Sequence, residues 1–232
     1  MNIITDITSP NYNDRASGKE INALILHFIG DLSAQGALDT YANPESQLSA
    51  HYMLDINGDA YALVDEGKRA WHSGKSYWQG ETDLNSTSIG IEIVNRGYAP
   101  TATPYPDTQI TALIELCQQI CARHPAIGTR ILGHSDIAPA RKIDPGHLFP
   151  WERLAQEGLG LWPVPEKQDY DNHNVGLLTT LHQIGYNPEC DGVTLVREFQ
   201  RHYESHVFEK GHEGQATEHT HAIATALLRM MS

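Results

Sequence analysis

The stretch ALILHF, residues 23–28, has the length and apolar composition of a buried β-strand, and it ends at His27 and Phe28. The residues that follow it, 33–42, carry apolar side chains at helical spacing, and Asn43-Pro44 ends this predicted helix. The chain thus begins with a buried strand that leads into a helix.

Two further regions have strand character. Residues 51–64 contain two strand-like runs around Asn57-Gly58, a pair that favours a two-residue turn, so they predict a β-hairpin. Residues 88–95, SIGIEIVN, place three isoleucines on one face of a strand and Glu92 on the other.

From Asp107 onward the spacing of apolar residues changes from two to nearly four. This predicts a helix that begins with Asp107 or Thr108 as its cap. Cys117 and Cys121 lie on its apolar stripe, and we interpret both as small core residues.

Residues 129–133, TRILG, predict another strand, which leads to His134. Strands therefore alternate with helices as far as Trp162-Pro163. This alternation predicts an α/β domain over residues 1–163, with a central mixed β-sheet flanked by helices.

The composition changes after this domain. Residues 164–174 are polar and predict a linker. Beyond them, apolar stripes predict three short helices over residues 177–184, 193–203 and 222–231. We therefore expect a small three-helix domain over residues 175–232.

The composition also limits the function. The 16 basic and 29 acidic residues give a net charge of −13, which argues against a nucleic-acid partner. No apolar run approaches the roughly 20 residues that span a bilayer, and the amino terminus shows no secretory signal. Three cysteines provide no disulfide framework, so the compartment stays open.

The densest chemical signal is GHSDIAPARKIDPG, residues 133–146. His134 and Asp144 are ten residues apart in it, and His27 ends a strand elsewhere. Catalytic zinc sites commonly use three nitrogen or oxygen ligands and leave a position for water. On spacing alone, a hydrogen-bonded core histidine and an aspartate in a turn remain alternative interpretations.

Five ordered segments carry a family resemblance: LILHF, SAHYML, AWHSG, LNSTSIGIEIVNRG and GHSDIAPARKIDPG. Together they resemble zinc-dependent N-acetylmuramoyl-L-alanine amidases, the group with the AmpD and AmiD types, phage amidases and peptidoglycan recognition proteins. The resemblance covers about residues 20–163. It implies a mixed sheet, one catalytic Zn²⁺, and hydrolysis of the amide that joins N-acetylmuramic acid to L-alanine of the peptidoglycan stem peptide.

The resemblance also implies roles for individual residues. It places the metal ligands at His27, His134 and Asp144, the catalytic acid at Glu92 and a catalytic lysine at Lys142. Glu92 would take a proton from water and pass one to the leaving amine, while Lys142 would stabilise the oxyanion.

Other residues of the same motifs are candidates for substrate binding. They are Tyr52, Trp71, His72 and Asn85, with packing or loop structure as the alternative for the last three. For His51, support of the site or the core and substrate contact are equally open.

Five of the 13 histidines lie between residues 202 and 221 of the carboxy-terminal domain. His202 and His206 are four residues apart, which suits a metal, but we interpret the histidines as a solvated face. The domain resembles a helical peptidoglycan-binding domain and departs from that pattern after Phe199.

Three functions are compared. The leading one is a peptidoglycan amidase anchored to the wall by its helical domain, which favours a periplasmic or secreted location. A cytoplasmic amidase that recycles anhydro-muropeptides is the alternative, since no signal is seen. A non-catalytic recognition protein is a third, although such relatives lack a metal ligand. The oligomeric state stays open.

Overall fold

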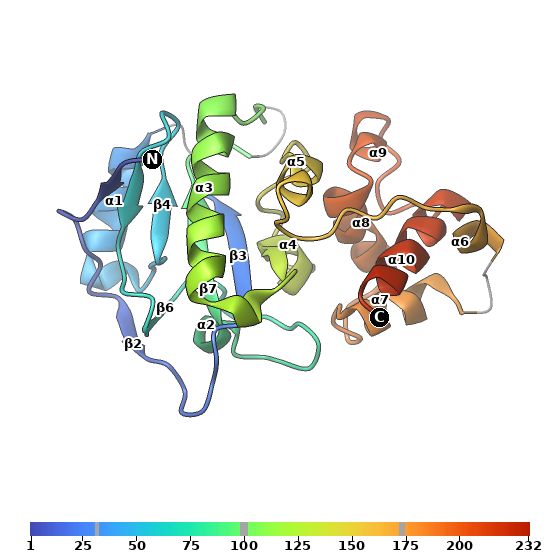
Figure 1. Ribbon diagram of the computed structural model, residues 1–232, viewed down its shortest axis with the longest axis horizontal. Coiled ribbons are helices and arrows are strands. Elements are labelled where there is room, and N and C mark those ends of the chain that lie inside the picture. The colour runs from blue at the N-terminus through green and yellow to red at the C-terminus, as the bar shows by residue number, and fades with distance from the viewer. Residues whose placement is uncertain (31–32, 98–101, 172–174) are drawn as a thin grey trace.

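The computed structural model describes residues 1–30, 33–97, 102–171 and 175–232. At its centre lies a six-stranded sheet in the order β1-β5-β4-β7-β3-β8, parallel throughout except for the antiparallel pair β4–β5 (Figure 1). Its strands are β1 Ile3–Ile4, β3 Ala23–Phe28, β4 Tyr52–Leu54, β5 Ala60–Ala62, β7 Ser88–Ile93 and β8 Ile131–Gly133. Two short strands, β2 Tyr12–Asp14 and β6 Lys68–Ala70, form a separate antiparallel sheet. The predicted mixed sheet is confirmed.

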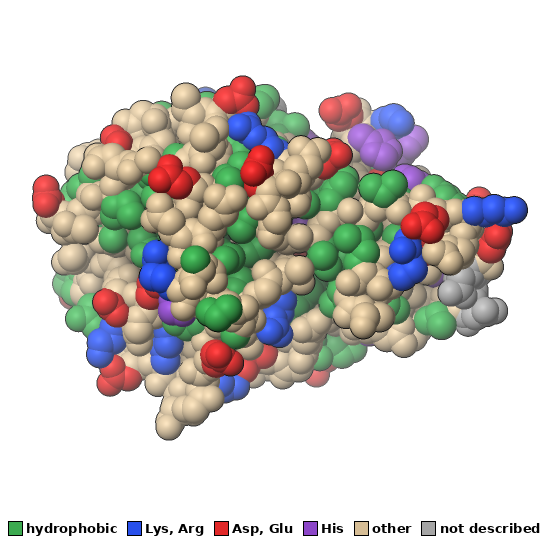
Figure 2. Space-filling model, viewed as in Figure 1, with side chains coloured by type: hydrophobic (Ala, Val, Ile, Leu, Met, Phe, Trp, Pro, Cys, Tyr) green, Lys and Arg blue, Asp and Glu red, His purple; other side chains and the backbone are tan. Residues whose placement is uncertain are grey.

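Helices flank this sheet, and the long α3 lies in front of it in Figure 1. The helices of the first 163 residues are α1 Ala34–Ala42, α2 Leu84–Thr87, α3 Asp107–Arg123, α4 His134–Ile137 and α5 Trp151–Gln156, with 3₁₀ turns at Pro44–Ser46 and Pro125–Ile127. In the space-filling view, the surface over these elements mixes charged and apolar side chains (Figure 2). Within the described ranges, no helix is both long and apolar enough to cross a membrane.

Two local predictions are wrong. The helix does begin at Asp107, but its N-cap residue is Pro106 and no side chain caps it. In the β4–β5 hairpin, Leu54 pairs with Ala60, which leaves a five-residue loop, residues 55–59, in place of a two-residue turn. Only the glycine of Asn57-Gly58 has a positive φ, so the pair cannot form the mirror-image turn that needs two such residues.

Strand β3 explains why the opening stretch is apolar at successive positions. Leu24 and Leu26 belong to a core that contains α3, whereas Ala23 and Ile25 belong to a second core shared with the carboxy-terminal helices. A parallel strand that is covered on both faces loses the alternation of apolar and polar residues. One face of β3 therefore belongs to the buried core that also contains the carboxy-terminal helices.

The carboxy-terminal region contains more helices than predicted. They are α6 Lys167–Asp171, α7 Leu177–Ile184, α8 Gly192–Tyr203, α9 His206–Glu209 and α10 Glu218–Met230. Helix α6 lies within the segment expected to be a linker, and Arg229 of α10 donates to its Asp169 at 2.9 Å. Residues 172–174 of that segment lie outside the described ranges. Thr217 caps α10, so this helix begins four residues earlier than predicted.

Asp136 joins the two regions at a buried point. Its Oδ1 accepts a hydrogen bond from the Tyr186 hydroxyl at 2.7 Å, and its Oδ2 accepts from Gly133 N and His202 Nδ1, each at 2.7 Å. The His202 ring also stacks on Trp151, with 3.7 Å between ring centroids. The interpretation of His202 as part of a solvated face is therefore wrong.

The other histidines between residues 206 and 221 are more accessible to solvent than the buried His202. His206, His212 and His219 are exposed and His221 is half-buried. Figure 2 shows histidine side chains gathered over α9. His206 begins α9 while His202 lies in α8, so the predicted four-residue pairing on one helix does not occur.

Candidate metal and catalytic site

His27, His134 and Asp144 meet at one edge of the sheet. The Nδ1 atoms of the two histidines are 2.9 Å apart, and Asp144 Oδ2 lies 3.0 Å from that of His27 and 2.9 Å from that of His134. All three side chains are buried. Within the described residues, this is the one group of three or more potential ligands found suitable for a metal ion.

The sheet register brings these residues together. Parallel β3 and β8 pair Leu26 with Gly133, so His27, the next residue of β3, lies beside His134, the first residue after β8. Asp144 follows on the loop after α4, where its carbonyl accepts from Ser135 N at 3.0 Å. Two neighbouring strand ends and one returning loop therefore form the site.

The hydrogen-bond partners of the histidines suit a metal. His134 Nε2 lies 3.0 Å from the Ser73 carbonyl, which only accepts, so the neutral ring carries its hydrogen on Nε2 and offers the Nδ1 lone pair to a metal. Burial, followed by the effect of His134, lowers the pKa of His27 to about 4, so His27 is neutral at pH 7. Burial alone would raise the pKa of Asp144, but His134 and His27 outweigh it and lower that pKa well below its usual value.

The donor set fits a divalent cation. When His134 is neutral with its hydrogen on Nε2, the lone pairs of His134 Nδ1 and Asp144 Oδ2 face one another at 2.9 Å, an arrangement that a metal cation between them makes favourable. A tetrahedral ion with bonds of about 2.0–2.1 Å would hold its donors about 3.3 Å apart. The observed separations require an outward shift of only a few tenths of an ångström to reach that value.

Glu92 lies on the strand next to His27. The register of β3 with β7 pairs His27 with Glu92, and the Glu92 side chain is half-buried. Burial and then the charge of Asp144 raise the pKa of Glu92 to about 8, against the opposing effects of the Tyr41 hydroxyl and Lys142. A carboxyl with its pKa near neutrality can both accept and release a proton at the pH of the reaction.

Lys142 lies in the same loop as Asp144. It is half-buried, and its amide donates to the Ala138 carbonyl at 3.0 Å. Its charge is close enough to lower the pKa of both Glu92 and His27. The structure thus brings Lys142 and Glu92 to the metal-ligand group.

His72 lies behind His27 and is buried. Its Nδ1 lies 3.1 Å from His27 Nε2, and its Nε2 lies 3.3 Å from Ser88 Oγ. When His27 Nδ1 offers its lone pair to a metal, its Nε2 hydrogen donates to His72. A Cβ atom on Gly90 would lie 2.4 Å from the His72 ring, so glycine is required there. These contacts place His72 against the side of His27 that faces away from the metal-ligand group, and a substrate contact by His72 stays a prediction.

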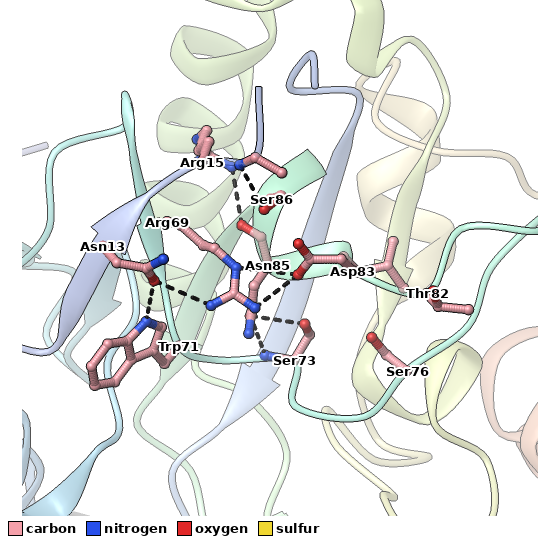
Figure 3. Close-up of polar contacts among 12 residues, drawn as sticks. Asn13, Arg15, Arg69, Trp71, Ser73, Ser76, Thr82, Asp83, Asn85 and Ser86 are labelled. Carbon is pink, nitrogen blue, oxygen red and sulfur yellow. Dashed lines mark hydrogen bonds and ion pairs between the residues drawn. The ribbon is translucent and has the colours of Figure 1, made fainter. Parts of the chain in front are cut away.

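Asn85 fixes the loop that carries His72. Its buried Oδ1 accepts from the amide and hydroxyl of Ser73 at 2.9 and 2.8 Å (Figure 3). It also accepts from the His72 amide at 3.1 Å. The half-buried Trp71 is held by its Nε1, which donates to Asn13 Oδ1 at 2.7 Å. Trp71 is half-buried whereas His72 and Asn85 are buried, so Trp71 is the most accessible of the three to a substrate.

Tyr52 lies with a different group. Its hydroxyl donates to Glu66 at 2.7 Å, and Glu66 also accepts from Arg123 and bonds to His124. Burial alone would raise the pKa of Glu66, but these hydrogen bonds lower it to about 2. His51 is buried nearby, where its Nδ1 accepts from Gly90 N at 3.0 Å. Neither side chain contacts the metal ligands.

Two supporting residues were not predicted. The Tyr41 hydroxyl of α1 lies close enough to Glu92 to lower its pKa, and Arg141 donates to the same Ser73 carbonyl that binds His134. Tyr41 appeared in the sequence only as a member of an apolar stripe. Nothing in its spacing indicated that its hydroxyl would reach Glu92.

Comparison with known proteins agrees with this site. Residues 17–147 match the family model described as N-acetylmuramoyl-L-alanine amidase. Over 240 residues the chain is 35% identical to AmiD of Escherichia coli, covering 92% of this chain and 84% of AmiD. It is 36% identical over 172 residues to AmpD of Haemophilus influenzae, covering 65% of this chain and 91% of AmpD.

Solved structures give the same result. The E. coli AmiD structure, a complex with the substrate anhydro-N-acetylmuramic acid-L-Ala-D-γ-Glu-L-Lys, has a TM-score of 0.78 at 35% identity and covers 93% of this chain and 92% of AmiD. AmpDh3 of Pseudomonas aeruginosa has a TM-score of 0.77 at 31% identity and covers 98% and 99% of the two chains. Both similarities extend through the carboxy-terminal helices.

Proposed function

Because the chain belongs to the N-acetylmuramoyl-L-alanine amidase family, we propose that it hydrolyses the amide between the lactyl group of N-acetylmuramic or anhydro-muramic acid and L-alanine, using Zn²⁺ held by His27, His134 and Asp144. The observation that supports this most directly is the convergence of three buried donor atoms beside Glu92. A bound Zn²⁺ would supply Lewis acidity and lower the pKa of a coordinated water to about 7.

The protein residues then have distinct roles in the proposal. Glu92 accepts the proton of the attacking water and delivers a proton to the departing alanine nitrogen. Lys142 places a positive charge beside the carbonyl oxygen as negative charge develops there. His72 and Ser73 hold the ring orientations of the two histidines.

For the substrate, we propose the muramyl stem peptide in both polymeric and soluble form. The AmiD structure contains an anhydro-muramyl tripeptide, and AmpDh3 has been solved with an anhydromuramic pentapeptide. Within this proposal, residues 1–163 form the catalytic domain, 164–174 the connection and 175–232 the wall-binding domain. Trp71 is the proposed contact for the sugar or lactyl group.

The test measures muropeptide cleavage on sacculi and on soluble anhydro-muropeptide. We expect the zinc-loaded protein to release peptides beginning with L-alanine, a chelator to stop this, and Glu92→Gln to reduce kcat by at least about 10²-fold. Binding of muropeptide without turnover in zinc-loaded protein would instead support a recognition protein. Equal activity after metal removal would refute the mechanism.

A further inference from the structure

The buried carboxylate of Asp136 is held mainly by the carboxy-terminal helices. The Tyr186 hydroxyl and His202 Nδ1 each lie 2.7 Å from one of its oxygens, and Gly133 N donates to the oxygen that His202 also binds. Asp136 is 1% exposed, Tyr186 0% and His202 3%, so this junction is closed to solvent. Within the described residues, two of the three donors to this carboxylate therefore come from outside the catalytic domain.

The same carboxylate shapes the turn that carries a metal ligand. Gly133 ends β8 and His134 begins α4, so the bond from Gly133 N to Asp136 closes a turn around His134. The amide that follows His134 donates to the Asp144 carbonyl at 3.0 Å. A Cβ atom on Gly133 would lie 3.3 Å from Asp136 Oδ2, so the turn is closely packed. The placement of Asp136 thus affects the backbone of both His134 and Asp144.

His202 is fixed on both faces of its ring. The ring stacks on Trp151 of α5 with 3.7 Å between centroids and on Tyr203 with 3.9 Å. Helix α8, which contains His202, also lies beside α4 (Figure 1). Because the two neighbouring rings restrict rotation of the imidazole, Nδ1 stays directed at Asp136.

Loss of these donors would disturb the metal-ligand turn. A buried carboxylate without its partners is strongly unfavourable, so Asp136 would turn toward other donors or toward water. Its Oδ2 also holds Gly133 N, and the turn would therefore move with it. A zinc ligand must lie within about 0.2 Å of its usual bond length, so even a small displacement of His134 weakens metal binding.

We propose that Tyr186 and His202 are positioning residues of the metal site and act on His134 through Asp136. This inference rests on the proposed zinc site and extends it to the carboxy-terminal helices. These helices then complete the metal site in addition to their proposed role as a wall anchor. Coupling of this kind is reciprocal, so bound Zn²⁺ should in turn stabilise the packing of the helices on the catalytic domain.

The test measures the zinc affinity of the full-length protein by competition with a chelator. Tyr186→Phe and His202→Leu each remove one donor and should raise the Kd for Zn²⁺ about 10-fold, the lower end of the range for outer partners of a ligand. His202→Asn has an amide that can donate from nearly the position of Nδ1, so it should recover most of that loss. Cobalt(II) in place of zinc gives a second readout, because its visible absorption reports the ligand geometry and should change in Tyr186→Phe.

A matched control separates positioning from general destabilisation. Leu227 is 1% exposed in the core that the helices share with the central sheet. Leu227→Ala opens a cavity there and should lower Tm at least as far as Tyr186→Phe, yet it leaves the donors of Asp136 in place. It should therefore keep the Kd for Zn²⁺ within about two-fold of the wild type and keep the cobalt spectrum.

Two outcomes would overturn the inference. One is an unchanged Kd in Tyr186→Phe, and the other is an equal rise in Leu227→Ala, which would make lost stability the cause. Zinc-loaded wild type that does not cleave muropeptide would instead overturn the proposed function and leave this inference intact.

Discussion

Removal of the Tyr186 hydroxyl tests how strongly the carboxy-terminal helices are joined to the rest of the chain. Tyr186 is fully buried, and its hydroxyl donates to the carboxylate of Asp136, which is itself 1% exposed. Tyr186→Phe keeps the ring packed between Trp78 and Phe199. A hydrogen bond to a charged group contributes about 1.5–3 kcal/mol, so we expect a loss of that size in the free energy of unfolding.

Urea denaturation, followed by fluorescence and by circular dichroism, measures this loss. For a chain of this length, 2 kcal/mol corresponds to a fall in Tm of about 4–8 °C. Because Trp78 packs on Tyr186 and both belong to a core shared between the domains, the two probes should report one coincident transition.

A matched control uses a tyrosine of a different kind. Tyr12 is 44% exposed, so Tyr12→Phe should change the free energy of unfolding by less than about 0.5 kcal/mol. If Tyr186→Phe were equally silent, or if the two probes gave separate transitions, the reasoning that the Asp136 contacts join the domains would be refuted.

Three further predictions concern the site and its surroundings. His72→Ala should weaken zinc binding by about 10–100-fold in a chelator competition, since His27 loses its hydrogen-bond partner; affinity within two-fold of wild type would contradict this. In metal-free protein, Glu92 has a folded pKa of about 8 against 4.5 unfolded, so its contribution to stability is greatest below pH 4.5 and falls as the pH rises to 8. Glu92→Gln should abolish that fall in denaturation curves between pH 5 and 9, and an unchanged slope would argue against it. Glu66 has its folded pKa lowered from 4.5 to about 2, so its stabilisation is present above pH 4.5 and is lost as the pH falls toward 2. Allowing for solvent screening, Glu66→Gln should flatten about 1–2 kcal/mol of this acid dependence, and a curve that keeps its full slope would exclude Glu66 as its source.

The strands and long helices could be predicted because their local patterns agree with the final packing. Residues 23–27, the isoleucines of residues 88–93 and the α3 stripe as far as Ile120 are buried as expected, whereas Phe28 and Cys121 are half-buried. The hairpin loop and the cap of α3 could not be predicted so well. Several turn and cap geometries differ by about 1 kcal/mol, and packing of the flanking strands and helices selects among them.

At the site, the family resemblance of the motifs predicted which side chains meet, whereas residue types and spacing alone left alternatives open. His27 and His134 are far apart in the sequence, and only the β3–β8 register places them side by side. The motif positions of Tyr52, His72 and Asn85 did not show that their polar groups bond to Glu66, His27 and Ser73. Substrate contact by these three residues stays a prediction.

Because the carboxy-terminal helices share a core with the central sheet, deleting them cannot separate the proposed wall anchoring from catalysis. Ala23, Ile25 and Leu132 of the central sheet are buried in the core shared with the carboxy-terminal helices. A chain cut after residue 163 would lose those helices, and each large aliphatic side chain then exposed to water costs about 1.5–3 kcal/mol. Asp136 would also lose the hydrogen bonds of Tyr186 and His202, two residues from a metal ligand. Loss of activity in such a truncation would therefore not measure wall binding, and point substitutions on the exposed surface of the full-length chain are the experiment that can.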